Sequence, residues 1–249
     1  MTIGIVMPCY DRELQLKKTL LSISLSKYTD YHIVIVDDGS PVPLDPSDFP
    51  IATVLSILPS DKAWINPVVP INMGIARLLD NHSPDIIILQ NAECAHIGDV
   101  ISYAADYTAD KTYLSFGCIS MERPSLPSDD EIREDISQGT ISGKGMRWYN
   151  HPLFAPAAFG WCVAMTTTTI KKLNGYDEQF KDVMGGADKD LIARAKLFGC
   201  GIEITTDPFV VHQYHSRHYR RGFPTHRSLS PKVEPTTHRA VHLVTKDFV

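Results

Sequence analysis

Short apolar segments ending in polar residues recur along the first half of the chain. Four of them are rich in aliphatic residues and run into turn or polar residues: 2–8, 32–40, 51–58 and 85–91. Apolar runs of this length that are bounded by turn residues are typical of buried strands. A fifth segment, 111–119, has the same character. The pattern therefore predicts a sheet built on these strands.

Two helices are expected between the first four strands. Residues 12–26 place Leu14, Thr19 or Leu20 and Ile23 at helical spacing, and a second helix is expected over 72–81, with its start marked by Asn72 and Gly74. Strands that alternate with helices predict an α/β fold with a mostly parallel central sheet, flanked by helices. Ligands bind such sheets beyond the carboxyl ends of the strands, so the polar residues after each strand fall on the ligand side.

The second half of the chain is less regular. Residues 121–146 are acidic, contain Pro and Gly and show neither period, which predicts a flexible loop over 121–150. An amphipathic helix is expected over 185–199. We expect a single domain with a following tail, divided into 1–120, the loop 121–150, a second structured half at 151–220 and a basic, histidine-containing tail at 221–249.

Composition and charge exclude several classes of protein. The chain is 43% hydrophobic and 21% charged, as is ordinary for soluble globular proteins, and no apolar run approaches a membrane span. The start has no signal-peptide pattern, so we expect a cytoplasmic protein, in a bacterial or virus-infected cell. Five cysteines without a C-x-x-C pair argue against a disulfide framework and a thiolate zinc site. The net charge of −5 argues against nucleic-acid binding.

Two adjacent carboxylates follow the second predicted strand. Asp37 and Asp38 stand in the segment "VIVDDGS". Acids at this place in nucleotide-binding sheets hydrogen-bond a ribose or a base edge. Asp and Gly are also common turn formers, so the segment is also compatible with a plain turn, which is the commoner use of these residues. Taken alone, the segment leaves both interpretations open.

Six segments in a fixed order carry a family resemblance. They are "MPCYDR", "VIVDDGS", "INMGIARLLDN", "DIIILQNAE", "NGYDEQF" and "GGADKDL". Their order and spacing resemble those of glycosyltransferase family 2, whose members have the GT-A fold. The resemblance runs from about Ile3 to His215. It implies one GT-A domain in which the first half binds a nucleotide-sugar and the second half binds the acceptor.

The resemblance implies a role for residues in each segment. Nucleotide-sugar binding would fall to Pro8, Tyr10, Asp11, Arg12, Asp37, Asp38, Asn72, Gly74, Asn91 and Ala92. Glu93 would bind a divalent metal ion that neutralises the departing diphosphate, and Asp188 would remove the proton from the acceptor hydroxyl. Family 2 members invert the anomeric centre, which fits a single base with no covalent intermediate.

The sequence departs from the family at two acidic motifs. Asn91-Ala92-Glu93 stands where the family has Asp-x-Asp, so Glu93 is expected to coordinate metal with little help from other carboxylates. Ala187 replaces the usual Glu before Asp188. Asp190 falls on the acceptor side, where it is also suited to anchoring the start of a helix.

Histidines near the end of the last predicted strand offer a further ligand. The segment "VVHQYHSRHY" contains His212, His215 and His218, and His212 is the best match for a metal ligand. A nitrogen ligand favours Mn²⁺ over Mg²⁺. His96 is a weaker candidate. Trp161 is expected on the acceptor side, where its ring is suited either to stacking on a sugar or to the core.

The sequence thus predicts a metal-dependent, inverting glycosyltransferase of hexosyltransferase type, acting in polysaccharide biosynthesis. The expected donor is a UDP-sugar and the expected acceptor is a glycan hydroxyl. One alternative is a nucleotide-sugar-binding protein that has lost transfer, because Asn91 and Ala187 replace acids. A second is a nucleotidyltransferase, although "MPCYDRELQ" lacks the glycines of a phosphate loop. A third is an interaction module that uses the basic tail.

Overall fold

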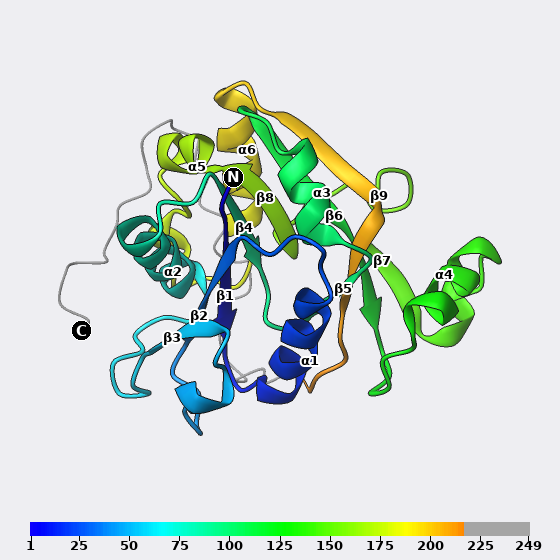
Figure 1. Cartoon of the computed structure of the whole chain (residues 1–249), viewed down its shortest axis with the longest axis horizontal. Helices are drawn as coiled ribbons and strands as arrows, with labels where there is room; N and C mark the ends of the chain where they lie inside the picture. The colour runs from blue at the N-terminus through cyan, green and yellow to red at the C-terminus, as the bar shows by residue number, and fades with distance from the viewer. Residues whose placement is uncertain (217–249) are drawn as a thin grey trace.

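The computed structural model describes residues 1–216 and contains one sheet of nine strands with helices on both faces (Figure 1). The strands are β1 (Ile3–Cys9), β2 (Tyr31–Asp37), β3 (Ala52–Ser56), β4 (Ile86–Gln90), β5 (Cys94–Ile97), β6 (Thr112–Met121), β7 (Met146–Asn150), β8 (Cys162–Thr166) and β9 (Gly201–His212). The helices are α1 (Glu13–Ser24), α2 (Val68–Asn81), α3 (Val100–Tyr107), α4 (Asp129–Ser137), α5 (Thr167–Leu173) and α6 (Ala187–Leu197), with short 3-10 turns η1 (Pro46–Asp48), η2 (Ile141–Lys144) and η3 (Glu178–Phe180). The predicted tail at 221–249 and His218 lie outside the described residues.

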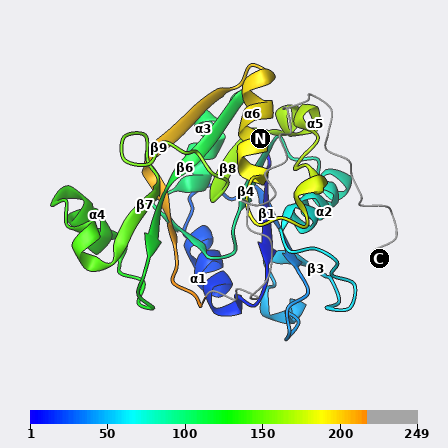
Figure 2. The ribbon, with the colours of Figure 1, turned by 180° about the vertical axis from the view of Figure 1, so that it is seen from behind.

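The helices divide between the two faces of the sheet. Leu16 of α1 and Val100 of α3 belong to one buried cluster, whereas Val68 of α2 and Leu191 of α6 belong to another on the opposite face (Figure 2). Strands covered on both sides bury successive residues, which explains the continuous apolar runs in the sequence. No helix among residues 1–216 has the length and apolar character needed to cross a bilayer.

The predicted α/β fold is confirmed, but the sheet is mixed rather than mostly parallel. The strand order is β3-β2-β1-β4-β8-β6-β9-β5, with β7 paired to β6. The pairs among β1 to β4 are parallel, whereas β8 runs antiparallel to both β4 and β6. Parallel neighbours need a crossover connection, usually a helix. Within the described residues no helix lies between β7 and β8, and β8 enters the sheet antiparallel to both of its neighbours.

The segment predicted as a loop over 121–150 contains α4, η2 and β7 instead. Ser128 and Glu131 form a capping box that begins α4, and Ile132 of this helix is fully buried against β6 and β9 in a small separate core. A Ser-x-x-Glu pattern is a sequence signal for a helix start. The prediction was wrong because α4 buries so few apolar residues that no period is visible over the segment.

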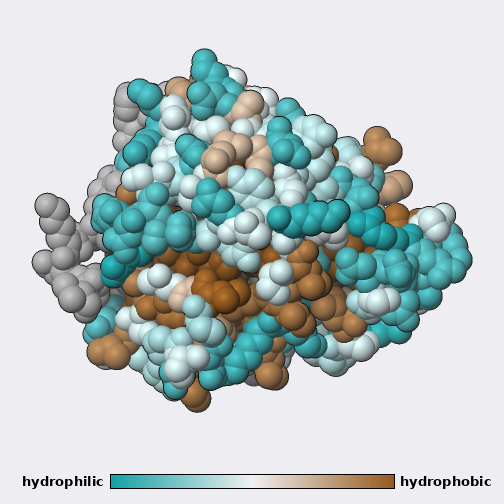
Figure 3. Space-filling view, viewed as in Figure 1, coloured by the Kyte–Doolittle hydropathy of each residue, from teal (hydrophilic) through white to brown (hydrophobic). Residues whose placement is uncertain are grey.

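The apolar face of α1 agrees with the prediction at Thr19, Leu20 and Ile23 and differs from it at Leu14. Leu14 is 74% exposed, and the buried positions are Leu16, Thr19, Leu20 and Ile23. The helix carries a second apolar stripe at Leu14, Leu21 and Leu25, which are all exposed. Figure 3 shows apolar side chains across the middle of the face that carries α1. The helical spacing of apolar residues does not determine which of two apolar stripes packs against the core.

Helix α2 begins at Val68, four residues before the predicted start at Asn72. Pro70 lies in its first turn, where backbone N–H groups have no partner within the helix, so proline is compatible with this position. Gly74 lies inside the helix against β1, because a Cβ there would come within 2.4 Å of Cγ1 of Val6. The structure therefore gives Gly74 a packing role.

We expect Gly74→Ala to lower the free energy of unfolding by about 1 kcal/mol, because overpacking outweighs the gain in helix propensity. Chemical denaturation measures this change. Gly143→Ala is the matched control, since a Cβ there meets no atom within 4 Å. Equal stability of the two variants would contradict the close packing of α2 on β1.

Candidate functional site

Three potential metal ligands meet at the carboxyl edge of the sheet. Oε1 of Glu93 lies 3.3 Å from Nε2 of His212 and 3.6 Å from Nε2 of His215. One ligand atom from each residue lies within 4.8 Å of the other two. Atoms bonded to one cation at roughly 2.1–2.6 Å lie at most about 5 Å apart. The Glu93–His212–His215 cluster therefore has the dimensions of a cation site.

The strand pairing explains how these residues come together. The chain turns between β4 and β5, where N–H of Cys94 donates to the carbonyl of Asn91 at 3.0 Å, and this turn carries Glu93. Cys94 pairs with His212, the last residue of β9, in an antiparallel ladder. The predicted ligands Glu93 and His212 are thus brought together by neighbouring strand ends. His215 joins them from three residues beyond the strand.

Burial and neighbouring charges shift the pKa values of Glu93 and His215. Burial opposes ionisation of Glu93, but the hydrogen bond to His212 and the charges of His212 and His215 outweigh it, so its pKa is lowered. Burial lowers the pKa of His215, which favours the neutral imidazole. The ligand form of Glu93 is the ionised carboxylate, and that of His215 is the neutral imidazole.

His96, the weaker metal candidate, does not join the cluster. Its Nε2 lies 2.8 Å from Oε1 of Gln90 inside the protein, and burial lowers its pKa to about 3. The imidazole therefore stays neutral and is held by an amide.

Asp188 lies in the first turn of α6 and is held by two donors. Its Oδ1 accepts a hydrogen bond from the hydroxyl of Tyr176 at 2.9 Å, and the backbone of Gly160 also donates to the carboxylate. A Cβ at Gly160 would lie 2.7 Å from Oδ1, so this approach requires glycine. Burial raises the pKa of Asp188 despite both hydrogen bonds. A carboxylate with a raised pKa is a stronger proton acceptor.

Trp161 connects Asp188 with the Glu93–His212–His215 cluster. It follows Gly160, its carbonyl accepts from N–H of Asn91 at 3.1 Å, and its ring meets the ring of His212 edge-on at a centroid distance of 5.0 Å. Its buried indole N–H has no hydrogen-bond partner among the described residues. The predicted acceptor-side residue therefore lies between the predicted base and the potential metal ligands.

Asp38 is paired with two residues that the sequence analysis did not single out. Nζ of Lys62 and Nε1 of Trp64 each donate to one oxygen of this carboxylate at 2.7 Å. Lys62 also lies 4.0 Å from the centre of the Tyr10 ring. Burial raises the pKa of Asp38, although Lys62 and Trp64 oppose the shift. Both partners follow β3, so the rule that ligands bind beyond strand ends could have found them.

Asp37 organises the turn after β2. Its carboxylate oxygens accept from N–H of Ser40 at 3.0 Å and of Leu44 at 2.9 Å. The hydroxyl of Ser40 in turn accepts from N–H of Asp11 at 2.9 Å, which joins this turn to the one after β1. The turn interpretation therefore describes Asp37, whereas Asp38 carries the polar contacts beside Tyr10.

The remaining residues of the predicted nucleotide site are close to these turns. Pro8 lies within β1, opposite Val36. Arg12 precedes α1 and donates to the carbonyl of Ser216 at 3.0 Å. Asn91 is partly exposed in the turn that carries Glu93, and Ala92 is buried there.

Asn72 makes hydrogen bonds within the fold. Its Nδ2 donates to the carbonyl of Tyr176 and to Oε1 of Glu178, both at 2.8 Å, and its Oδ1 accepts from N–H of Tyr176 at 2.9 Å. The side chain thus connects α2 to the segment before α6. Gly74 packs the same helix on β1, and the nucleotide-binding roles of Asn72 and Gly74 stay predictions.

Asp190, predicted on the acceptor side, forms a buried ion pair within α6. Its Oδ2 accepts from Nε of Arg194 at 2.8 Å, and both side chains are less than 9% exposed. Arg194 also donates to the carbonyls of Leu173 and Gly175. The pair therefore ties α6 to the end of α5, which agrees with the helix-anchoring role.

We expect Arg194→Met to lower the free energy of unfolding by about 3–5 kcal/mol, because it leaves a buried carboxylate unpaired. Arg133→Met removes the exposed pair with Asp207 and should cost less than about 1 kcal/mol. Urea denaturation of both variants measures the difference. Similar losses would contradict the structural role of Arg194.

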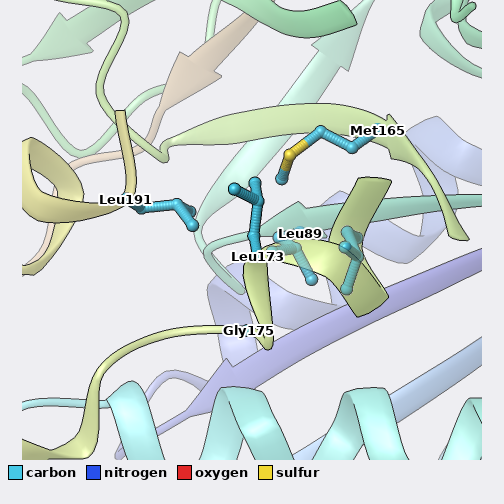
Figure 4. Close-up of a pocket in the computed structure, with 6 residues that line it drawn as sticks. Leu89, Met165, Leu173, Gly175 and Leu191 are labelled. Atoms are coloured by element: carbon cyan, nitrogen blue, oxygen red, sulfur yellow. The ribbon is translucent and has the colours of Figure 1, made fainter. Parts of the chain in front are cut away.

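An apolar pocket lies on the face of the sheet that α2 and α6 cover, apart from the Glu93–His212–His215 cluster. It is lined by Leu89, Met165, Ile170, Leu173, Gly175 and Leu191. Figure 4 shows the leucine and methionine side chains gathered around it. A nucleotide needs polar partners for its phosphates and base, so this pocket belongs to the core.

Two segments of the chain match the models of known protein families. Residues 4–44 match the model of glycosyl transferase family 2, and residues 142–218 match the model described as the N-terminal domain of galactosyltransferase. The first segment contains Tyr10 and Asp38, and the second contains Asp188 and both histidines of the cluster. A search of curated protein sequences found no match.

Several solved glycosyltransferase structures share the fold. TarS 1-349 from S. aureus in complex with UDP has a TM-score of 0.61 at 12% identity, covering 86% of this chain and 61% of that chain. The catalytic domain of Drosophila β1,4-galactosyltransferase 7 in complex with xylobiose has a TM-score of 0.54 at 15% identity, covering 88% and 73%. The mannosyltransferase PcManGT from Pyrobaculum calidifontis, in complex with GDP-Man and Mn²⁺, has a TM-score of 0.51 at 17% identity, covering 89% and 58%.

The chain spans about 60% of the length of the TarS 1-349 structures. At these identities the structural likeness establishes the fold, and the two family matches add the sequence relationship. The predicted GT-A fold and the predicted resemblance are both confirmed. The chain thus has the GT-A fold of these glycosyltransferases, and two of its segments match the models of glycosyl transferase family 2 and of the galactosyltransferase N-terminal domain.

Proposed function

We propose that this chain transfers a sugar from a nucleotide-sugar to a glycan hydroxyl, with inversion and with the help of a divalent metal ion. The observation that carries the proposal is the Glu93–His212–His215 cluster, which Trp161 connects to Asp188. The likeness to TarS with UDP supports a UDP-sugar donor, whereas PcManGT binds GDP-Man. A glycan acceptor implies a role in polysaccharide biosynthesis.

The donor set of the cluster fits a divalent transition metal. Glu93 offers a carboxylate oxygen, and His212 and His215 offer imidazole nitrogens. Nitrogen ligands suit Mn²⁺ better than Mg²⁺, which prefers oxygen. When bound, the ion supplies positive charge for the departing diphosphate. The second histidine compensates for the acid that Asn91 replaces.

Asp188 is the proposed general base. Its carboxylate takes the proton of the acceptor hydroxyl, while the hydroxyl of Tyr176 and the backbone of Gly160 hold it in position. A single base that activates the acceptor for direct displacement inverts the anomeric carbon. Tyr10, Asp38 and Lys62 provide polar and aromatic groups for the nucleoside.

A nucleotide-sugar-binding protein without transfer is the second candidate, favoured by Ala187 in place of an acid. Calorimetric titration with UDP and Mn²⁺, combined with an assay of UDP-sugar hydrolysis, separates the two. Metal-dependent UDP binding with turnover supports the transferase. Binding without turnover, unchanged in Asp188→Asn, supports the second candidate.

A further inference from the structure

The segment that follows β9 is tied to α1 by side-chain hydrogen bonds. Nε2 of Gln213 donates to the carbonyl of Gln15 at 3.0 Å and to Oγ1 of Thr19 at 3.1 Å. Nε2 of Gln15 donates to the carbonyl of Tyr214 at 3.0 Å. Arg12 adds its bond to the carbonyl of Ser216. Figure 1 shows the end of β9 running down to the start of α1.

Gln213 stands at the centre of these contacts and beside the Glu93–His212–His215 cluster. Its backbone N–H donates to the carbonyl of Glu93 at 2.9 Å, and its side chain is buried, with the residue only 4% exposed. It lies between His212 and His215 in the sequence. One residue therefore connects the backbone at the carboxylate ligand, the segment that carries both imidazoles, and α1.

We propose that Gln213 is a positioning residue that sets the separation of Glu93, His212 and His215 for a divalent cation. The inference rests on the proposed function, because it assumes that the cluster binds metal. His215 lies beyond the last strand pair, so sheet hydrogen bonds do not fix its distance from Glu93. The buried amide of Gln213 and its partners on α1 supply that restraint instead.

The physical reason is the cost of leaving a buried amide unsatisfied. The two acceptors on α1, the carbonyl of Gln15 and Oγ1 of Thr19, hold the Gln213 side chain in one orientation. Without that amide the segment after β9 gains conformational freedom. His215 must then be ordered when the ion binds, and this cost weakens the binding of the ion. Groups that orient ligands in this way typically change metal affinity by about 10–100-fold when replaced.

Titration of the full chain with MnCl₂, followed by calorimetry, tests the proposal. We expect Gln213→Ala to raise the Kd for Mn²⁺ about 10-fold. Gln15→Ala, which removes the bond to Tyr214 from a partly exposed position, should raise it by a smaller factor and keeps the test valid if Gln213→Ala does not fold. Gln138→Ala, which changes an exposed glutamine at the C-terminal end of α4, should leave the Kd unchanged.

Thermal unfolding in EDTA provides the second readout. A purely structural role would lower the unfolding temperature of Gln213→Ala without changing the Kd of the folded protein for Mn²⁺, and this outcome would overturn the positioning role while the proposed function stands. A wild-type chain that binds no Mn²⁺ would overturn both. A higher Kd in Gln213→Ala and in Gln15→Ala, with Gln138→Ala unchanged, supports the inference.

Discussion

We expect Asp188→Asn to lower the rate of sugar transfer by about 10²–10⁴-fold, the range that general-base catalysis contributes. The change keeps the size of the side chain and leaves Oδ1 able to accept the hydrogen bond from Tyr176. It removes the group that takes a proton from the acceptor. A transfer assay with a UDP-sugar and a glycan acceptor measures the rate.

Binding measurements separate this loss from a loss of the site. The Kd values for UDP and Mn²⁺ should stay within a few-fold of wild type, because Asp188 is not in the Glu93–His212–His215 cluster. Asp182→Asn is the matched control, since Asp182 is an exposed carboxylate six residues earlier. An unchanged rate of transfer in Asp188→Asn would contradict the role of Asp188 as the general base.

We expect Glu93→Gln to weaken Mn²⁺ binding by more than about 100-fold, because loss of a direct ligand exceeds the 10–100-fold effect of removing a supporting group. Glu93 supplies the single carboxylate of the cluster. Transfer at limiting Mn²⁺ should fall in parallel and should recover in part at high Mn²⁺. Electron paramagnetic resonance of free Mn²⁺ measures the binding.

Removal of metal from the wild-type chain provides the companion measurement. Incubation with EDTA should abolish transfer, and added Mn²⁺ should restore it, with Mg²⁺ less effective because two of the three ligands are nitrogen atoms. Glu122→Gln, at an exposed position, should behave as wild type. Full Mn²⁺ affinity in Glu93→Gln would show that the ion binds elsewhere.

The sequence predicted the part of the site that strand order determines. Glu93 and Asp38 follow β4 and β2, and parallel strands bring their carboxyl ends to one edge. His212 was expected beside them because it ends the last apolar run, and pairing of β5 with β9 brings it opposite Cys94. Strand ends are visible in a sequence, so these positions were predictable.

The parts that the sequence did not predict depend on tertiary contacts. His215 enters the cluster only because the segment after β9 follows a particular path along α1. Lys62 reaches Asp38 from a segment without periodicity. Asn72 stands in a segment that resembles a family motif, yet its amide joins α2 to Tyr176 in the segment before α6. A single sequence shows which groups are present, but not which partners they find.

The most direct test of the proposed function is a crystal structure of the chain with UDP and Mn²⁺. We expect the ion to be coordinated by Glu93, His212 and His215 and to contact the diphosphate, with the nucleoside beside Tyr10 and Asp38. An ion bound away from all three cluster residues, or UDP bound away from this sheet edge, would contradict it.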